Sequence, residues 1–252
     1  MELTYSIVVK RALIVGLVAG VLLALYLAIL VEPTIDEAID IEEAAAAVEG
    51  TDDGEEPLVT RGQQVGGGML ATVIFAGLVS VVFGTVYASV RHRITAASDF
   101  SRVVLLAAVA FATTAVFPAL KYPANPPAVG DPSTVNERSL QYGVLIVFGI
   151  VGAVLLAKLS GRLRDRLDDP IRIVVLTASV VVLYGTALLA FPASPDSIDP
   201  SMPARLIWEF RVQSLGGLAL LWTALGLGLG WSLSRVTAAA RPSSRATPSV
   251  TA

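Results

Sequence analysis

Six runs of about 20 apolar residues divide the chain, and each is long enough to cross the ~30 Å hydrocarbon core of a bilayer as a helix. None of the runs has an acidic or basic residue at its centre. The composition agrees, because only 15% of the residues are charged, against about a quarter in a soluble domain. The sequence therefore predicts an all-α integral membrane protein. The predicted spans are residues 12–31, 66–90, 102–120, 140–159, 171–191 and 213–234.

The basic residues are unevenly distributed between the connections. The two terminal segments and the connections after the second and fourth runs contain 13 of the 18 Lys and Arg residues. Because cytoplasmic segments accumulate Lys and Arg, this distribution predicts a multi-pass protein of the cell membrane with both termini in the cytoplasm. Segments 32–65, 121–139 and 192–212 are then outside. They contain the other five basic residues, which are Arg61, Lys121, Arg138, Arg205 and Arg211.

The outer segments repeat one pattern three times. Runs one, three and five end at prolines that lie 85 and 74 residues apart, Pro33, Pro118 and Pro192. Because proline interrupts a helix, we expect each of these helices to end there. The returning runs begin with an arginine, a glutamine and glycines. This pattern predicts three tandem helical hairpins, over residues 9–91, 100–160 and 170–235, related by a pseudo-threefold axis along the membrane normal.

The repeated arginine–glutamine pairs have two interpretations. The arginines can anchor helix ends at the outer headgroups, or the pairs can converge on one outer vestibule where the glutamines form a polar constriction. A glutamine inside the apolar boundary needs a partner and should face the bundle. Neighbouring glycines would let the helices approach closely there. The pairs are Arg61 with Gln64, Arg138 with Gln141, and Arg211 with Gln213; the glycines are Gly66, Gly67, Gly143, Gly216 and Gly217.

The first outer segment, residues 32–65, is strongly acidic. It holds eleven of the 21 Asp and Glu residues of the chain. Residues 33–50 have helical character, and the acids are either a solvated surface or a mouth that raises the local cation concentration. The segment lacks the spacing of a calcium-binding loop, so a tight calcium site is not expected there.

The second outer segment, residues 118–139, is rich in proline. The sequence from Ala115 to Pro132 is expected to form neither helix nor sheet, and its prolines favour a stiff, extended conformation. Lys121 and Tyr122 are typical interfacial residues. We therefore predict that the segment from Lys121 to Asp131 lies as a lid across the mouth of the bundle.

Several chemistries are excluded by the residues that the sequence lacks. There is no cysteine, and the single histidine, His92, cannot form a histidine cluster. There is no phosphate-binding glycine loop. Glu137–Arg138 and Glu209–Arg211 are interpreted as caps and salt bridges at helix starts, so we do not expect an enzyme.

The transmembrane domain is predicted to comprise residues 1–237, followed by a disordered cytoplasmic tail, 238–252.

The stretch "FPALKYPANPPAVGDPSTVNERSLQY", Phe117 to Tyr142, resembles the signature of the CbtA family of cobalt transporter subunits. The basic start, the first helix ending near "EP", the acidic segment and the Gly- and Trp-rich last helix are similar too. The resemblance implies a membrane subunit of cobalt(II) uptake, linked to cobalamin synthesis. It also implies a small single-span partner, CbtB, that carries histidines. Its best matched positions are Lys121, Tyr122, Asn125 and Gly130.

Three functions remain open at this stage. The first is metal-ion uptake, with cobalt(II) as the transported ion, no permanently bound cofactor and no nucleic-acid partner. The others are a permease for another small solute, which the outer arginines would suit if it is anionic, and an assembly subunit that does not transport. No metal ligands are assigned. The candidate path residues are Arg61, Gln64, Lys121, Tyr122, Asn125, Asp131, Glu137, Arg138, Gln141, Glu209, Arg211 and Gln213.

Overall fold

The computed structural model describes residues 3–49, 59–127, 129–130, 132–195, 198 and 202–239. All regular structure in these residues is helical, and six helices are long and apolar enough to cross a membrane. Each corresponds to one of the six runs expected from the sequence. The helices are α1 (Tyr5–Tyr26) continued by α2 (Glu32–Glu49), α3 (Arg61–Val90), α4 (Asp99–Phe111) continued by α5 (Phe117–Lys121), α6 (Val135–Leu163), α7 (Asp169–Ala190) and α8 (Ala204–Ala239).

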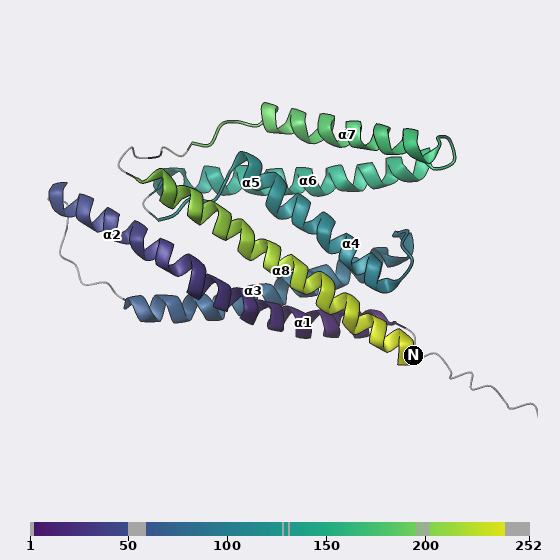
Figure 1. Cartoon of the computed structure of the whole chain (residues 1–252), viewed down its shortest axis with the longest axis horizontal. Coiled ribbons are helices and arrows are strands. Elements are labelled where there is room, and N and C mark those ends of the chain that lie inside the picture. The colour runs from purple at the N-terminus through teal and green to yellow at the C-terminus, as the bar shows by residue number, and fades with distance from the viewer. Residues whose placement is uncertain are drawn as a thin grey trace, which may run out of the picture.

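The long helices form an elongated bundle in which α8 lies centrally (Figure 1). Helix α1 packs along α3, and α8 packs against both α1 and α4. Helix α7 lies on α6, which reaches the rest of the bundle through the segment around α5. Within the described residues, α7 and α8 are therefore not a closely packed pair, and the three-hairpin arrangement stays a prediction.

Small residues set the closest helix contacts. A Cβ added to Gly20 of α1 would lie 2.9 Å from Ala76 Cβ of α3, and Gly16 faces Ser80 in the same way. On α8, a Cβ added to Gly226 would lie 2.9 Å from Ala107 Cβ of α4. Membrane helices lack a hydrophobic driving force between them, so close backbone approach supplies much of their attraction. These glycines fix how α1, α3, α4 and α8 meet.

Two of the three repeated prolines do not end their helices, contrary to the sequence-based expectation. The chain remains helical through Pro33 into α2 and through Pro118 to Lys121. Each proline is preceded by a five-residue π-helix, η1 (Leu27–Val31) or η3 (Ala112–Val116). The wider turn accommodates a residue that has no N–H and whose ring crowds the preceding turn. Only Pro192 behaves as expected, because α7 ends at Ala190 and Phe191 is extended.

The outer segments are therefore more helical than expected. Helical character, predicted for residues 33–50, is confirmed through Glu49, so the first part of the acidic segment is a rod rather than a loop. The proline-rich segment loses regular structure only after Lys121; it then passes Gly130, whose φ is 103°, and a short 3₁₀ turn, η4 (Pro132–Thr134). At the other end of the molecule, α8 extends to Ala239, two residues into the predicted tail; residues 240–252 lie outside the described part.

Candidate functional site

Arg61 binds two carboxylates of α2. Its Nε and Nη2 donate to Asp36 Oδ1 at 2.8 and 2.7 Å, and Nη2 also donates to Glu32. The acids are four residues apart and thus share one face of α2. The Arg61 side chain, at the start of α3, is 39% exposed and that of Glu32 21%. This ion-pair cluster links α2 to α3.

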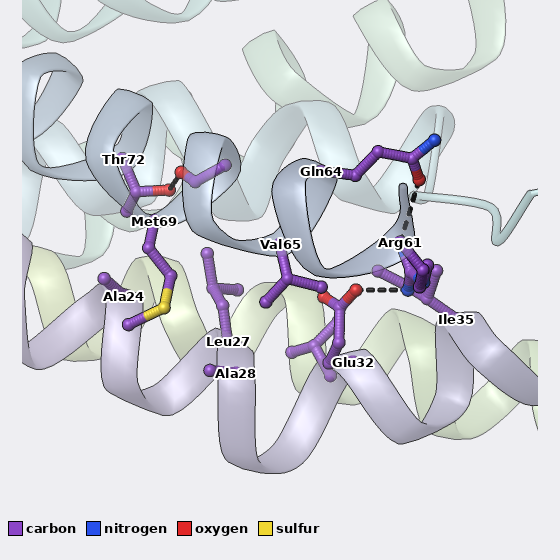
Figure 2. Close-up of a pocket in the computed structure, with 12 residues that line it drawn as sticks. Ala24, Leu27, Ala28, Glu32, Ile35, Arg61, Gln64, Val65, Met69 and Thr72 are labelled. Carbon is purple, nitrogen blue, oxygen red and sulfur yellow. Dashed lines mark hydrogen bonds and ion pairs between the residues drawn. The ribbon is translucent and has the colours of Figure 1, made fainter. Parts of the chain in front are cut away.

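A crevice of about 230 Å³ lies beside this cluster, between the α1–η1–α2 rod and α3 (Figure 2). Its wall is mostly apolar, and its polar groups come from Glu32, Arg61, Gln64 and Thr72. Gln64 Oε1 accepts from Arg61 Nη1 at 3.4 Å, and the Thr72 hydroxyl is bonded to Gly68 O. Figure 2 shows Glu32 and Arg61 meeting at one end and Met69 lying between the two helices. The crevice thus has a charged end and an apolar interior.

Gln213 of α8 is held by α1 and α2. Its Oε1 accepts a hydrogen bond from buried Thr34 of α2 at 2.9 Å, and its backbone carbonyl accepts from Tyr26 of α1 at 3.1 Å. The expectation that this glutamine faces the bundle is consistent with these contacts. Neither Thr34 nor Tyr26 was selected from the sequence, because no local pattern marks a partner that is 179 or 187 residues away.

Arg211 binds the proline-rich segment. Its Nη2 donates to Asn125 Oδ1 at 2.8 Å and its Nε to Ala124 O at 3.3 Å. Four residues further on, Val129 packs in an apolar cluster with Ala38 of α2 and Leu206 of α8. The segment therefore bridges α2 and the N-terminal part of α8.

The beginning of the same segment is tied to α7. Lys121 Nζ donates to Leu188 O at 2.9 Å, and the Tyr122 hydroxyl donates to Pro192 O at 2.9 Å. Tyr122 is buried, and this burial, with a smaller contribution from the charge of Glu137, raises the pKa of its phenol, which keeps it a donor. The proline-rich segment thus runs from the end of α7 towards α8 and α2.

The remaining candidates make local contacts at helix starts. Gln141 Nε2 donates to Glu137 Oε1 at 2.8 Å, one turn earlier on α6. Arg138 follows Glu137 directly in the sequence. Glu209 accepts from Arg205 at 2.6 Å, and Arg205 also pairs with Glu37 of α2. The repeat pattern missed the ion pair between Arg205 and Glu37, which links α8 to α2. Asp131 lies outside the described residues.

The structure brings the candidate residues together in separate pairs. Arg61 lies with Gln64 at α2, Arg211 with Asn125 at the proline-rich segment, and Glu137 with Gln141 on α6. Convergence on one vestibule stays a prediction. The expected close approach is confirmed at Gly216 and Gly217, which contact Tyr26, and is wrong at Gly66, Gly67 and Gly143, which face open space. The described ranges contain no group of three or more His, Cys, Asp or Glu side chains that could hold a metal ion.

Together the six long apolar helices define a multi-pass helical membrane protein. A family model described as "Probable cobalt transporter subunit (CbtA)" matches residues 6–234. The chain belongs to the CbtA family, which consists of transporter subunits and not of enzymes. Comparison with curated proteins and with solved structures gave no match.

Proposed function

We propose that this chain is the membrane subunit of a cobalt(II) uptake system in the cell membrane and works with a partner subunit. The observation that carries the proposal is the family match over residues 6–234, nearly the whole membrane domain. The description as a subunit supports a partner. The resemblance implies a small single-span CbtB-like protein that carries histidines. It would supply ligands that a chain with one histidine lacks.

The outer end of the bundle favours a cation over an anion. Arg61 is already bonded to Asp36 and Glu32, and Arg211 to Asn125. An anionic solute would have to replace these oxygens, whereas a cation finds carboxylates and amide oxygens in place. The acidic α2 rod would raise the cation concentration at this end. In this proposal the proline-rich segment is the outer lid, because it reaches from α7 to α8 and α2.

The test is cellular cobalt content, measured by elemental mass spectrometry at low external Co²⁺. Cells carrying the chain with its small partner are compared with cells carrying either protein alone and with empty cells. We expect a gain in cobalt only when the membrane chain is present, and the largest gain with both proteins. No gain, with both proteins detected in the membrane, would contradict uptake of cobalt and favour an assembly role. An Arg138→Ala variant that loses uptake of an anionic solute but not of Co²⁺ would favour the anion permease.

A further inference from the structure

Arg11 of α1 is a partly buried positive charge whose hydrogen-bond partners are neutral. Its Nη1 donates to Ser232 Oγ of α8 at 2.8 Å and to Ser232 O at 3.4 Å. In the part of the chain that the structure describes, these are the contacts that hold the guanidinium, and no carboxylate lies beside it. A guanidinium has five N–H donors, and both bonds come from Nη1. Arg11 therefore joins α1 to α8 and still has N–H groups with which to bind an anion.

Arg235 lies on the same side of α8, one turn beyond Ser232. Gly228, Ser232 and Arg235 are spaced four and three residues apart, so they share one face of the helix. That face is turned towards α1, because a Cβ added to Gly228 would lie 2.7 Å from Val15 Cγ1. Ser232 binds Arg11 on the same face. The side chains of Arg11 and Arg235, named here the arginine pair, therefore start from facing surfaces of α1 and α8.

The arginine pair lies at the apolar boundary of the membrane domain. The first apolar run begins directly after Arg11, and the last run stops directly before Arg235. Leu3 and Val236 share an apolar cluster, and Figure 1 shows the N-terminus beside the C-terminal end of α8. The Arg235 guanidinium lies over the exposed ring of Trp231, 5.1 Å from its centroid. Because tryptophan is enriched at the level of the lipid headgroups, we infer that the pair lies at that level.

Little negative charge opposes the arginine pair. The bundle at this end is built from α1, α3, α4 and α8. Within the described residues, α1 and α3 contain no Asp or Glu, and the last acid of α8 is Glu209, near the other end of that helix. Asp99, at the start of α4, is already paired with Arg102. A partly buried charge is costly unless it is paired, so this position favours an anion from outside the chain.

We propose that the arginine pair binds the headgroup of an anionic phospholipid where α1 and α8 meet. The forked N–H groups of Arg11 and Arg235 match the oxygens of one phosphate. Lys10, exposed and adjacent to Arg11, adds a third positive charge. The apolar ring of Trp231 would border the acyl chains. The predicted orientation makes this the inner leaflet, and the proposal does not depend on cobalt uptake.

The test is native mass spectrometry of the purified full chain in detergent. The protein is titrated with phosphatidylglycerol or with phosphatidylcholine that has the same acyl chains. We expect the wild type to bind phosphatidylglycerol at least fivefold more tightly, and equal affinity for the two lipids would overturn the proposal. Arg235→Ala should weaken phosphatidylglycerol binding about fivefold, the effect of one basic residue at a membrane surface. Because Arg235 is exposed and its ring contact is with its own helix, this variant should fold.

Arg166→Ala is the matched control, since Arg166 is an exposed arginine at the start of the connection from α6 to α7. It should bind phosphatidylglycerol like the wild type. Equal losses in Arg166→Ala and Arg235→Ala would show a general attraction between charges and no defined site.

Two further measurements separate the fork from the charge and the lipid from free phosphate. Arg11→Lys keeps the charge but loses the planar fork, so it should weaken binding several-fold; unchanged affinity would remove Arg11 from the site. Excess inorganic phosphate should not displace the lipid, because the acyl chains contribute to its binding. Displacement would show a site for free phosphate and contradict the assignment to a lipid.

Discussion

The Thr34 hydroxyl donates a hydrogen bond to Gln213 Oε1 at 2.9 Å and thereby joins the start of α2 to α8. Thr34 is only 5% exposed, and Gln213 is partly buried. The bond holds the acidic α2 rod against the central helix, just beyond the π-helix and Pro33.

Thr34→Val removes this bond while nearly preserving side-chain volume. We expect the protein to lose about 0.5–1.5 kcal/mol of stability, because the hydrogen bond to the partly buried amide of Gln213 is lost. Thermal unfolding in detergent, followed by circular dichroism, measures the loss. Thr34→Ser keeps the hydroxyl and should retain most of the stability; an equal loss in both variants would mean that the methyl group, not the hydrogen bond, matters.

Gly16→Ala should disrupt the contact between α1 and α3. The new methyl group would collide with Ser80, and such overpacking costs about 1–3 kcal/mol. Gly67→Ala is the control, since nothing lies within 4 Å of the added Cβ. In a helix that change should be neutral or stabilise by up to ~1 kcal/mol. The melting temperatures of both variants are compared with that of the wild type. A similar decrease in the two variants would contradict the packing between α1 and α3.

Arg211→Ala should loosen the proline-rich segment. The variant loses the bonds from Arg211 to Asn125 and Ala124, while Lys121 remains the nearby trypsin site. We expect cleavage after Lys121 in proteoliposomes to become several-fold faster, because the peptide bond must leave its folded position to be cut. Arg205→Ala removes a neighbouring arginine that does not bind this segment and serves as the control. Equal cleavage rates in Arg211→Ala and the wild type would show that other contacts hold the segment.

The predicted orientation can be tested with single cysteines, because the natural chain has none. Val48→Cys lies on α2, where the side chain is 88% exposed, and should react with a membrane-impermeant maleimide added to intact cells. Arg93→Cys, in the connection between α3 and α4, should react only after the membrane is permeabilised. The reverse pattern would place the termini outside, against the distribution of basic residues.

Much of the fold could be predicted from the sequence, because length and hydrophobicity decide which segments can cross a bilayer. The prediction that a proline ends the helix was wrong at Pro33 and Pro118, each of which is preceded by a π-helix that accommodates it. It was correct at Pro192, where no π-helix comes before the proline. The glycines were ambiguous in the same way. A glycine marks a possible close approach, and only the neighbours show that Gly216 has one and Gly67 does not.

Some residues of the candidate site could be selected from the sequence, and others could be found only in the structure. The repeat pattern selected Arg61, Gln64, Arg211 and Gln213 because each recurs at a helix start. It could not select Arg205 or Thr34, whose partners Glu37 and Gln213 come from elements more than 160 residues away. Glu32 was visible only as one acid among eleven. Its bond to Arg61 and its place beside the crevice became apparent only in the structure.

The sequence by itself determined the six spans, the all-helical class and the chemistry available between the spans, because these depend on local apolarity and on which residue types are present. Tertiary structure alone decided that α8 lies between α1 and α4, that Arg61 meets Glu32 and Asp36, and that a crevice accompanies one proline break and not the other. Those features depend on contacts between distant segments, whose free energies are set by shape and distance in the folded chain and are not encoded in any local pattern.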